Sequence, residues 1–554
     1  MNTQNNPPQT NSLSIRTIVN FPLLTTEPLC ELIETLGFKM GLAELRFCQN
    51  SFRNLKMNNP TINELKIIDR VFYDYSKRPS APLVASFLTN DKTVADTYAD
   101  LMARRKVVDP DYTAPCSVND MLDILPQYLG QNNSANIVLF AGKNRNTELS
   151  CLGHKRIAET GNSHLACAAG VKLKATSPIS NGNIVYAILK SFNPEPDFNE
   201  KLEKLLASSD VIKSVKQSHF FEDESVISVL ASLGRGIKLD TTNYEGKDGA
   251  ISPFEPLADG DTGVLAVFEK QGSVDMLLTA QFHGLRVIPL GYIVTGDSID
   301  GVSLSGERLS LKIPFLKTLA FSRPMTCEAD GDTPDTPNLD SSVYININND
   351  KYRMNSAICG GENYFMAGFN SVLYSYSLSV MCGENTVSTA STYTLPLNNP
   401  SEKDLGKSVE LILGAYRAEC EFSISDPNFK IQIGEKPSLC FHTLSKTRTS
   451  TPSSFVGKGS KIYYLEPVYN ENSLPDFENL KQMHTYIKSL IARGVILSIR
   501  PTTNSIDKTL EKMSGTVKPE IYESQKPASH FGGFIIESAT DIQGILIGET
   551  AVQA

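Results

Sequence analysis

The chain has 554 residues, 41% of them apolar and 20% charged, with a formal net charge of −9, which predicts roughly three to five globular domains. The acidic balance argues against a nucleic-acid partner, because phosphate backbones repel negative charge. The sequence contains no run of about 18 or more apolar residues and no signal-peptide pattern, so we expect a cytoplasmic protein without a membrane partner.

Cysteine and histidine are scattered along the chain. None of the ten cysteines lies in a CxxC pair, and the seven histidines form no HxxxH pattern and no cluster with cysteine. In a chain without an export signal, isolated cysteines are usually reduced and buried. We therefore predict free thiols and no metal site.

The first elements along the chain are helical. Apolar residues at three- and four-residue spacing predict helices over Glu27–Leu36 and Ile62–Tyr75. Thr61 precedes the second run and Glu64 follows three places later, which is typical of a capping box. A third helix is expected over Thr93–Arg105.

A weak internal repeat follows at an offset of about 275 residues. The predicted order in each copy is strand, helix, helix, strand, strand, with the strands read from β-branched runs bounded by glycine. The matched pairs are Gly182–Leu189 with Gly459–Glu466, Ile212–Val215 with Ile487–Leu490, Thr262–Glu269 with Gly532–Ser538, and Val287–Gly296 with Gly544–Ala551. We therefore predict a duplicated α/β unit, each copy preceded by a segment of about 100 residues.

Two stretches resemble one enzyme family. They are Leu42–Arg70, LAELRFCQNSFRNLKMNNPTINELKIIDR, and Leu230–Pro256, LASLGRGIKLDTTNYEGKDGAISPFEP. Both look like phosphoribosylformylglycinamidine synthase of the clostridial, single-chain type, a member of the aminoimidazole ribonucleotide (AIR) synthase-related superfamily. The resemblance implies an α+β fold with a duplicated AIR-synthase-like unit: two N-terminal halves that pair into a central β-barrel, and two α/β C-terminal halves.

The predicted organisation combines this resemblance with linker-like composition. Cys327–Ser342 is acidic and Pro-rich, and Thr443–Lys461 is Ser/Thr/Lys-rich. The predicted parts are a disordered tail (1–20), a helical linker-like region (21–82), a first N-terminal half (83–181), a first C-terminal half (182–325), a linker (326–343), a second N-terminal half (344–445) and a second C-terminal half (446–554).

Residues that the family uses for catalysis are missing from the first half. Where the family reads WSDHCRHTTF, this chain reads VFYDYSKRPSA, so that Tyr75 and Arg78 replace two histidines. A phenol and a guanidinium titrate far above neutrality and do not replace imidazole as a proton carrier. The family's loop GGRTGRDGIGGAT, whose backbone N–H groups would hold phosphate, becomes the acidic KSFNPEPDFNEK.

The second half lacks the acidic and amide residues that the resemblance leads us to expect. An approximate alignment on two cysteines places apolar or hydroxyl side chains at these positions, which are Ile358, Ser375, Ser379, Thr392 and Leu395. Hydroxyl groups are poor Mg²⁺ ligands beside carboxylates. We therefore predict no metal ligand and no catalytic residue in either half.

Six residues remain as candidates for ligand binding by this resemblance: Arg78, Glu148, Lys155, Arg156, Tyr244 and Asp248. Five of them have a structural alternative, and Glu148 belongs to Thr147-Glu148-Leu149, which resembles the family's TEI step. Arg78 would close a helix end, Lys155 and Arg156 would be solvated strand residues, and the YEGKDG run that holds Tyr244 and Asp248 would be a Gly-rich surface turn.

Three functions stay open. The first is a catalytically degenerate synthase-like protein, a pseudoenzyme that binds a protein partner or a small ligand and requires no cofactor. The alternative is an active ATP-dependent synthetase of the purine-biosynthesis type with altered site residues, which would bind ATP or ADP with Mg²⁺. The third is a scaffold whose role is assembly of a homo-oligomer.

Overall fold

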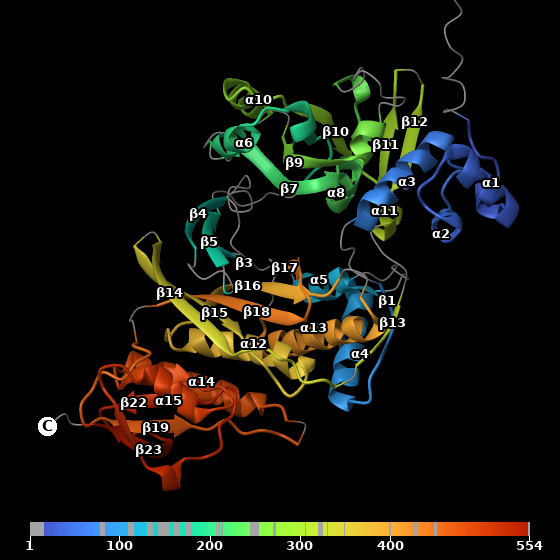
Figure 1. Ribbon diagram of the computed structural model, residues 1–554. Helices are drawn as coiled ribbons and strands as arrows, with labels where there is room; N and C mark the ends of the chain where they lie inside the picture. The colour runs from blue at the N-terminus through green and yellow to red at the C-terminus, as the bar shows by residue number, and fades with distance from the viewer. Residues whose placement is uncertain are drawn as a thin grey trace, which may run out of the picture. The chain divides into compact units, whose positions relative to one another are not determined.

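The computed structural model of the chain divides into two units. The first comprises residues 1–81, 145–155 and 172–323, and the second comprises residues 82–144, 156–171 and 324–554 (Figure 1). The structure describes residues 16–77, 83–108, 116–129, 137–141, 154–159, 165, 167–172, 179–206, 208, 211, 214–243, 254–269, 273–304, 306–319, 325–329, 331–347, 349–397, 400–424, 429–447, 451–471 and 473–551.

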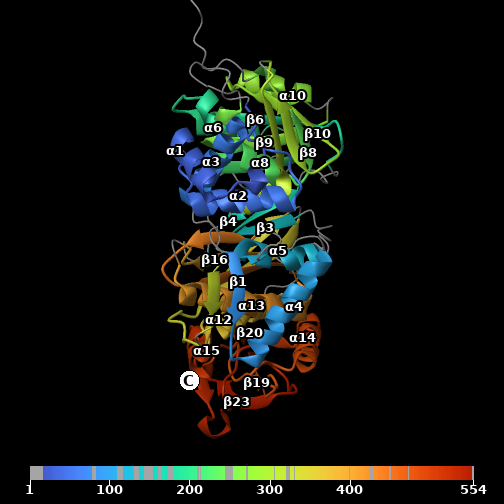
Figure 2. The same cartoon turned by 90° about the vertical axis from the view of Figure 1, so that its right-hand side faces the viewer.

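Helices open the first unit, where the blue segments of Figure 2 show them together. They are η2 (Phe21–Leu23), α1 (Thr26–Leu36), α2 (Leu42–Asn54) and α3 (Ile62–Lys77). The predicted helices and the capping box are confirmed: Thr61 N donates to Glu64 Oε2 at 2.8 Å, and Glu64 N donates to Thr61 Oγ1 at 3.1 Å. The other oxygen of Glu64 accepts from Ser310 N at 2.7 Å, which ties the start of α3 to the sheet of the same unit.

A seven-stranded sheet with the order β12-β11-β8-β10-β6-β9-β7 completes the first unit. Its strands are β6 (Ile184–Leu189), β7 (Val215–Ser225), β8 (Gly236–Leu239), β9 (Gly260–Phe268), β10 (Ile288–Val294), β11 (Ser298–Val302) and β12 (Arg308–Lys312). The connecting helices are η3 (Lys190–Phe192), α6 (Phe198–Leu206), α8 (Val226–Ser232), η4 (Thr241–Asn243), α9 (Glu255–Ala258), α10 (Ser273–Phe282) and α11 (Ile313–Leu319).

Both faces of this sheet are covered, because side chains alternate along each strand. Val185 and Ala187 of β6 belong to a cluster with α1, α2, α3, α8 and α11. Tyr186 and Ile188 belong to a second cluster with α6 and α10. The sheet is therefore the middle layer of three.

A five-stranded sheet with the order β14-β15-β18-β16-β17 forms the centre of the second unit. Its strands are β14 (Leu339–Ile347), β15 (Asp350–Ile358), β16 (Thr386–Leu395), β17 (Lys430–Ile433) and β18 (Ser438–Lys446). Two long helices, α12 (Tyr364–Val380) and α13 (Glu402–Phe422), lie side by side along it (Figure 1). α12 contacts β15 and β18 directly, and α13 packs on α12.

A three-stranded sheet, β3-β5-β4, shares an apolar cluster with the five-stranded sheet. Its strands are β3 (Ile137–Ala141), β4 (His154–Glu159) and β5 (Cys167–Lys172). Leu139 N donates to Ser388 Oγ at 3.0 Å, and Cys167 Sγ lies 3.4 Å from Ser356 Oγ. The resemblance led us to expect a closed barrel; among the described residues these strands instead form two separate sheets that pack together.

A smaller layer lies against α13. It contains the sheet β13-β1-β2, and its elements are β1 (Leu83–Leu88), α4 (Lys92–Val108), β2 (Cys116–Ser117), α5 (Val118–Tyr128) and β13 (Met325–Glu328). The predicted helix over Thr93–Arg105 is confirmed as α4. Tyr416 of α13 donates its hydroxyl to Asp100 Oδ2 of α4 at 2.7 Å, which fixes the two helices to each other.

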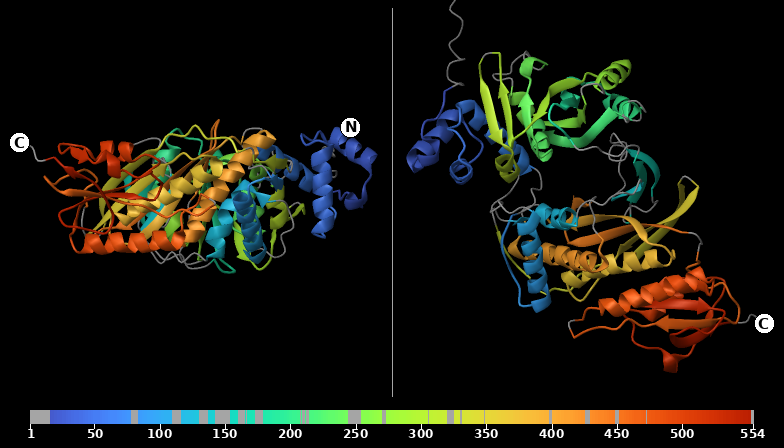
Figure 3. Two further views of the ribbon diagram at one scale, coloured as in Figure 1. Left: turned by 90° about the horizontal axis from the view of Figure 1, so that it is seen from below. Right: turned by 180° about the vertical axis from the view of Figure 1, so that it is seen from behind.

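The C-terminal part of the second unit is a sheet with the order β20-β22-β19-β23-β21. Its elements are β19 (Lys461–Leu465), α14 (Phe477–Ala492), β20 (Ile496–Pro501), α15 (Ile506–Met513), β21 (Pro519–Ile521), η5 (Glu523–Gln525), β22 (Phe534–Ser538) and β23 (Ile545–Thr550). Figure 3 shows α14 extended along this sheet. Phe534 contacts His484 of α14, whereas Ile535 clusters with α15, so the two helices cover opposite faces.

The two α/β sheets have the same strand order. In the first unit β7-β9-β6-β10-β8 are neighbours, and in the second β20-β22-β19-β23-β21 are neighbours, with every neighbouring pair antiparallel. Three of the matched sequence pairs fall on equivalent strands: β6 with β19, β9 with β22 and β10 with β23. The predicted order missed two strands in each copy: β7 and β8 in the first, and β20 and β21 in the second.

The two internal linker predictions are wrong for part of their length. The end of β13 and the start of β14 lie within the predicted acidic linker. β18 continues to Lys446, and Phe455 in the other predicted linker is only 3% exposed. The buried Glu537 carboxylate accepts from Val456 N at 3.0 Å and from Gly457 N at 2.7 Å, which holds this segment on the sheet. Among the described residues, no helix is long and apolar enough to cross a membrane.

Candidate functional site

The candidates named from the sequence lie where the structure describes no side chain. Arg78, Glu148, Tyr244 and Asp248 fall outside the described residues. Lys155 and Arg156 belong to β4, and their side chains fall outside the described ones. Their role in ligand binding therefore stays a prediction.

The positions that align with metal ligands of the resembled family lie in the interior of this protein. Ser375 and Ser379 are 0% and 2% exposed on α12. Ser375 Oγ lies 3.4 Å from Thr443 Oγ1, and Ser379 Oγ donates to Tyr376 O at 2.6 Å. Leu395 of β16 is fully buried. Across the part of the chain that the structure describes, no three His, Cys, Asp or Glu side chains are arranged to hold a metal ion.

A cavity of about 700 Å³ opens in the second unit, between the N-terminal end of α12 and the C-terminal sheet. The lining residues come from 333–338, 360–370, 469–470, 473, 504 and 529–531. Apart from the first turns of α12, these segments lie in loops that connect strands and helices. Loop residues and helix starts have backbone groups that no regular hydrogen-bond pattern pairs. We take this cavity as the candidate site.

Asparagine side chains cross one wall of this cavity as a hydrogen-bonded chain, which we call the amide chain (Asn504, Asn338, Gly360 and Asn370). Asn338 Nδ2 donates to Asn504 Oδ1 at 3.4 Å, and Gly360 N donates to Asn338 Oδ1 at 2.9 Å. Asn370 Nδ2 then donates to Gly360 O at 3.0 Å. Asn370 is 3% exposed, and its Oδ1 is buried without a hydrogen-bond partner. Such an atom costs free energy until it is paired.

The backbone at the start of α12 allows this arrangement only with glycine. A Cβ on Gly361 would lie 2.5 Å from Ala367 N, and a Cβ on Gly360 would lie 2.8 Å from Thr336 O. Asn363 caps the helix by accepting from Met366 N at 2.8 Å. The Gly-Gly-Glu-Asn sequence therefore brings the chain close to the first turn of the helix.

Aromatic rings form a second wall. The rings of Tyr469 and His530 lie 4.9 Å apart and 33° from parallel. The Tyr469 hydroxyl donates to Phe531 O at 2.8 Å, and burial raises the pKa of this hydroxyl well above its usual range. Thr502 Oγ1 donates to His530 O at 2.8 Å, which fixes the loop that carries the imidazole.

The lining is almost without charge. Glu362 contributes one carboxylate, and the described lining residues include no lysine or arginine. The remaining polar groups are amides, hydroxyls and the His530 imidazole. A site of this kind pairs well with neutral hydrogen-bonding ligands, whereas it gives no counter-charge to phosphate.

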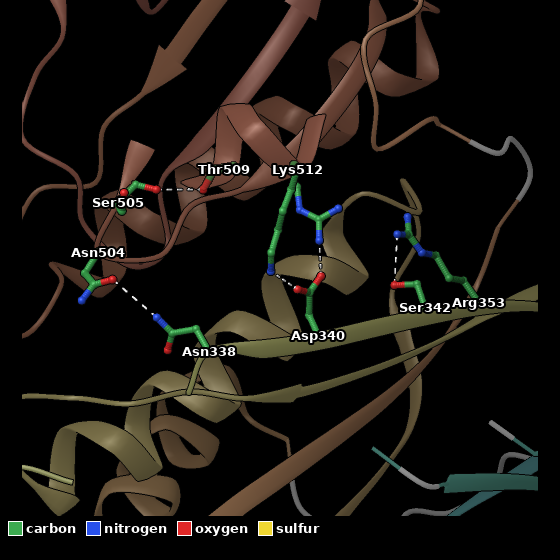
Figure 4. Close-up of polar contacts among 9 residues, drawn as sticks. Asn338, Asp340, Ser342, Arg353, Asn504, Ser505, Thr509 and Lys512 are labelled. Carbon is green, nitrogen blue, oxygen red and sulfur yellow. Dashed lines mark hydrogen bonds and ion pairs between the residues drawn. The ribbon is translucent and has the colours of Figure 1, made fainter. Parts of the chain in front are cut away.

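A buried ion cluster lies beside the cavity and joins β14 to the C-terminal sheet (Figure 4). The Asp340 carboxylate pairs with Arg500 of β20 and with Lys512 of α15. Its side chain is only 8% exposed, and that of Arg500 is 14% exposed. Asn338 directly precedes β14 and Asn504 follows β20. The ion pair between these two strands therefore also holds the two asparagines of the amide chain close together.

Two buried histidines of the second unit predict an acid-sensitive fold. Burial lowers the pKa of His442 and of His484 from 6.5 to about 3. His442 Nδ1 lies 2.8 Å from Ser356 Oγ and near Cys440, while His484 is surrounded by Tyr376, Phe422 and Phe534, with Lys488 adding a repulsive charge. Both imidazoles are therefore neutral when folded.

Stability from these groups is fully present above pH 6.5 and is lost as pH falls toward 3, because only the unfolded chain takes up the protons in that window. We expect a loss of about 1.4 kcal/mol per pH unit for each histidine. Urea unfolding of the second unit at several pH values measures this slope. The double variant His442→Leu, His484→Phe should lose most of it, and an unchanged slope would contradict the assignment.

Sequence reasoning missed the cavity residues. Tyr469, Asn504 and His530 carry no local motif. They meet because equivalent loops of one sheet gather at one end of it. Only the strand order, which the repeat partly predicted, could have suggested that these loops are neighbours.

Comparison with known proteins gives the fold and no closer relationship. No family model matches the chain, and no curated protein matches it. The structure is similar to phosphoribosylformylglycinamidine synthase II of Thermotoga maritima, with 13% identity, a TM-score of 0.52, and coverage of 92% of this chain and 100% of that chain.

Two further structures of the T. maritima protein, PurL, agree. PurL complexed with FGAR and PurL complexed with AMPPCP each show 12% identity and a TM-score of 0.50, covering 91% of this chain and 99% of that chain. The chain therefore has the mixed α/β fold of this synthase. At this level of identity the similarity concerns the fold and not the chemistry.

Proposed function

We propose that this chain is a phosphoribosylformylglycinamidine synthase-like protein that no longer catalyses a ligase reaction and acts by binding a small ligand in the cavity of the second unit. The proposal rests on the residues that occupy the positions aligned with the family's metal ligands. Ser375 and Ser379 are buried and already hydrogen-bonded within the protein, and the Leu395 side chain has no atom that can coordinate a metal ion. Mg²⁺ needs several oxygen ligands, usually including carboxylates.

The character of the cavity supports the same proposal. A phosphoryl-transfer site concentrates positive charge on the phosphates through Lys, Arg or metal ions. The described lining of this cavity offers one carboxylate and neutral polar groups instead. Such a lining suits recognition of a ligand better than stabilisation of a charged transition state.

The common strand order of the two α/β sheets supports a further part of the proposal, that they arose by duplication. The half boundaries predicted from the sequence, the cytoplasmic location and the absence of nucleic-acid partners stay predictions. A protein partner or self-association through this scaffold also remains part of the proposed role.

Calorimetry with ADP and ATP, each with and without Mg²⁺, tests the proposal at the level of binding. We expect no Mg²⁺-dependent ATP binding. Binding that does not depend on Mg²⁺ would indicate a retained structural nucleotide and leave the proposal standing. Tight, Mg²⁺-dependent ATP binding would contradict it and favour an active synthetase whose site uses Lys155, Arg156 and the YEGKDG run at Tyr244–Gly249.

A further inference from the structure

The amide chain ends in an unpaired acceptor at the cavity. Its links from Asn504 to Asn370 leave Asn370 Oδ1 buried and unpaired. At the other end, Asn504 is exposed, and Figure 4 shows its amide nitrogen directed away from Asn338. Asn370 Oδ1 needs a ligand N–H donor, and the Asn504 amide nitrogen needs a ligand acceptor; a lactam or carboxamide carries both kinds of group.

The aromatic wall favours a planar ligand. Tyr469 and His530 already lie in a tilted stack with ring centroids 4.9 Å apart, and both are half-buried. Offset-stacked aromatic rings gain about 0.5–1.5 kcal/mol beyond the area that they bury. A flat ring placed beside this pair would gain the same contact, which a puckered sugar ring alone would not.

The charge of the lining sets the third property of the ligand. Glu362 is exposed at the cavity, and no lysine or arginine occurs among the described lining residues. A phosphate would therefore meet a like charge without a counter-ion. The ligand should carry no negative charge.

We propose that the cavity binds an uncharged nucleobase or nucleoside with a lactam or carboxamide edge, whose N–H pairs with Asn370 Oδ1 and whose ring lies against Tyr469 and His530. This rests on the proposed function, because a binding role is assumed. A free base and a nucleoside share the recognised ring, so hypoxanthine and inosine together show whether the ribose adds affinity.

Calorimetry of the full chain with hypoxanthine, inosine, uridine, inosine 5′-monophosphate, ATP and glucose tests this. We expect at least one uncharged base or nucleoside to bind, and its 5′-monophosphate to bind at least about tenfold more weakly. Tighter binding of a nucleotide, binding of glucose alone, or binding of no member of the panel would overturn the inference. None of these outcomes decides the proposed loss of catalysis, which a turnover assay judges separately.

Variants of lining residues test whether the binding takes place in the cavity. Asn504→Ala should weaken nucleoside binding, and Glu362→Lys should raise the affinity for the monophosphate at least about tenfold by supplying a counter-charge. Tyr469→Phe keeps the ring and should bind, whereas Tyr469→Leu should not. Glu435→Lys, an exposed change away from the lining, is the matched control. Equal effects of Glu362→Lys and Glu435→Lys would overturn the assignment of the site.

Discussion

Asp340→Ala is expected to lower the free energy of unfolding of the second unit by about 3–5 kcal/mol. The Asp340 carboxylate is the shared partner of Arg500 and Lys512, and both Asp340 and Arg500 are largely buried. Arg500 Nε is already buried without a hydrogen-bond partner. Without Asp340 the guanidinium would keep its positive charge inside the protein with no opposite charge nearby.

The matched control is Glu523→Ala. Glu523 pairs with Lys526 at 3.5 Å in the same unit, but its side chain is 77% exposed, so its removal should cost no more than about 1 kcal/mol. Urea unfolding followed by circular dichroism, with hydrogen exchange to assign the loss to the second unit, measures both changes. If Asp340→Ala destabilised no more than Glu523→Ala, the ion cluster would not hold the cavity walls together.

Gly414→Leu is expected to prevent α12 and α13 from packing, at a cost of more than about 3 kcal/mol. The two helices approach through a reciprocal pair of glycines. A Cβ on Gly414 would lie 1.8 Å from Phe365 O, and a Cβ on Gly368 would lie 2.0 Å from Leu411 O. The obstructing atoms belong to the backbone of the facing helix, so a rotamer change cannot relieve the overlap.

Even Gly414→Ala should destabilise strongly, since the overlap begins at Cβ. Gly515→Ala serves as the control, because a Cβ there meets nothing within 4 Å. Thermal unfolding and the yield of folded protein compare the variants. An alanine at position 414 that left the melting temperature within the range of Gly515→Ala would show that the helices can separate without loss, contrary to the close approach described here.

Local signals predicted local structure well. The Thr61–Glu64 capping box and the apolar spacing that follows specify α3, and both are present. The apolar β-branched runs at β6, β9 and β10 could be recognised in the sequence because these strands are buried on both faces. By contrast, β7 reads VKQSHFFEDES, an edge strand too polar to stand out, and it was missed.

Long-range contacts explain most of what the sequence concealed. The Ser/Thr-rich segment around Phe455 looks like a linker, yet Glu537 holds its backbone from about 80 positions away along the chain, a contact that composition cannot show. The cavity is similar, because Asn338, Asn370 and Asn504 have no common motif and meet only through tertiary packing. The six ligand candidates that the resemblance supplied lie outside the side chains that the structure describes, so they stay predictions.

The most direct test of the proposed loss of catalysis is a turnover assay on the full chain. Purified protein would be mixed with ATP, Mg²⁺, formylglycinamide ribonucleotide and ammonia, and phosphate release would be followed against a reaction without the ribonucleotide. We predict the same release with and without that substrate, because the aligned metal positions Ser375, Ser379 and Leu395 are buried and offer no carboxylate. Phosphate release that requires both Mg²⁺ and the ribonucleotide would contradict this account and identify the chain as a working synthetase.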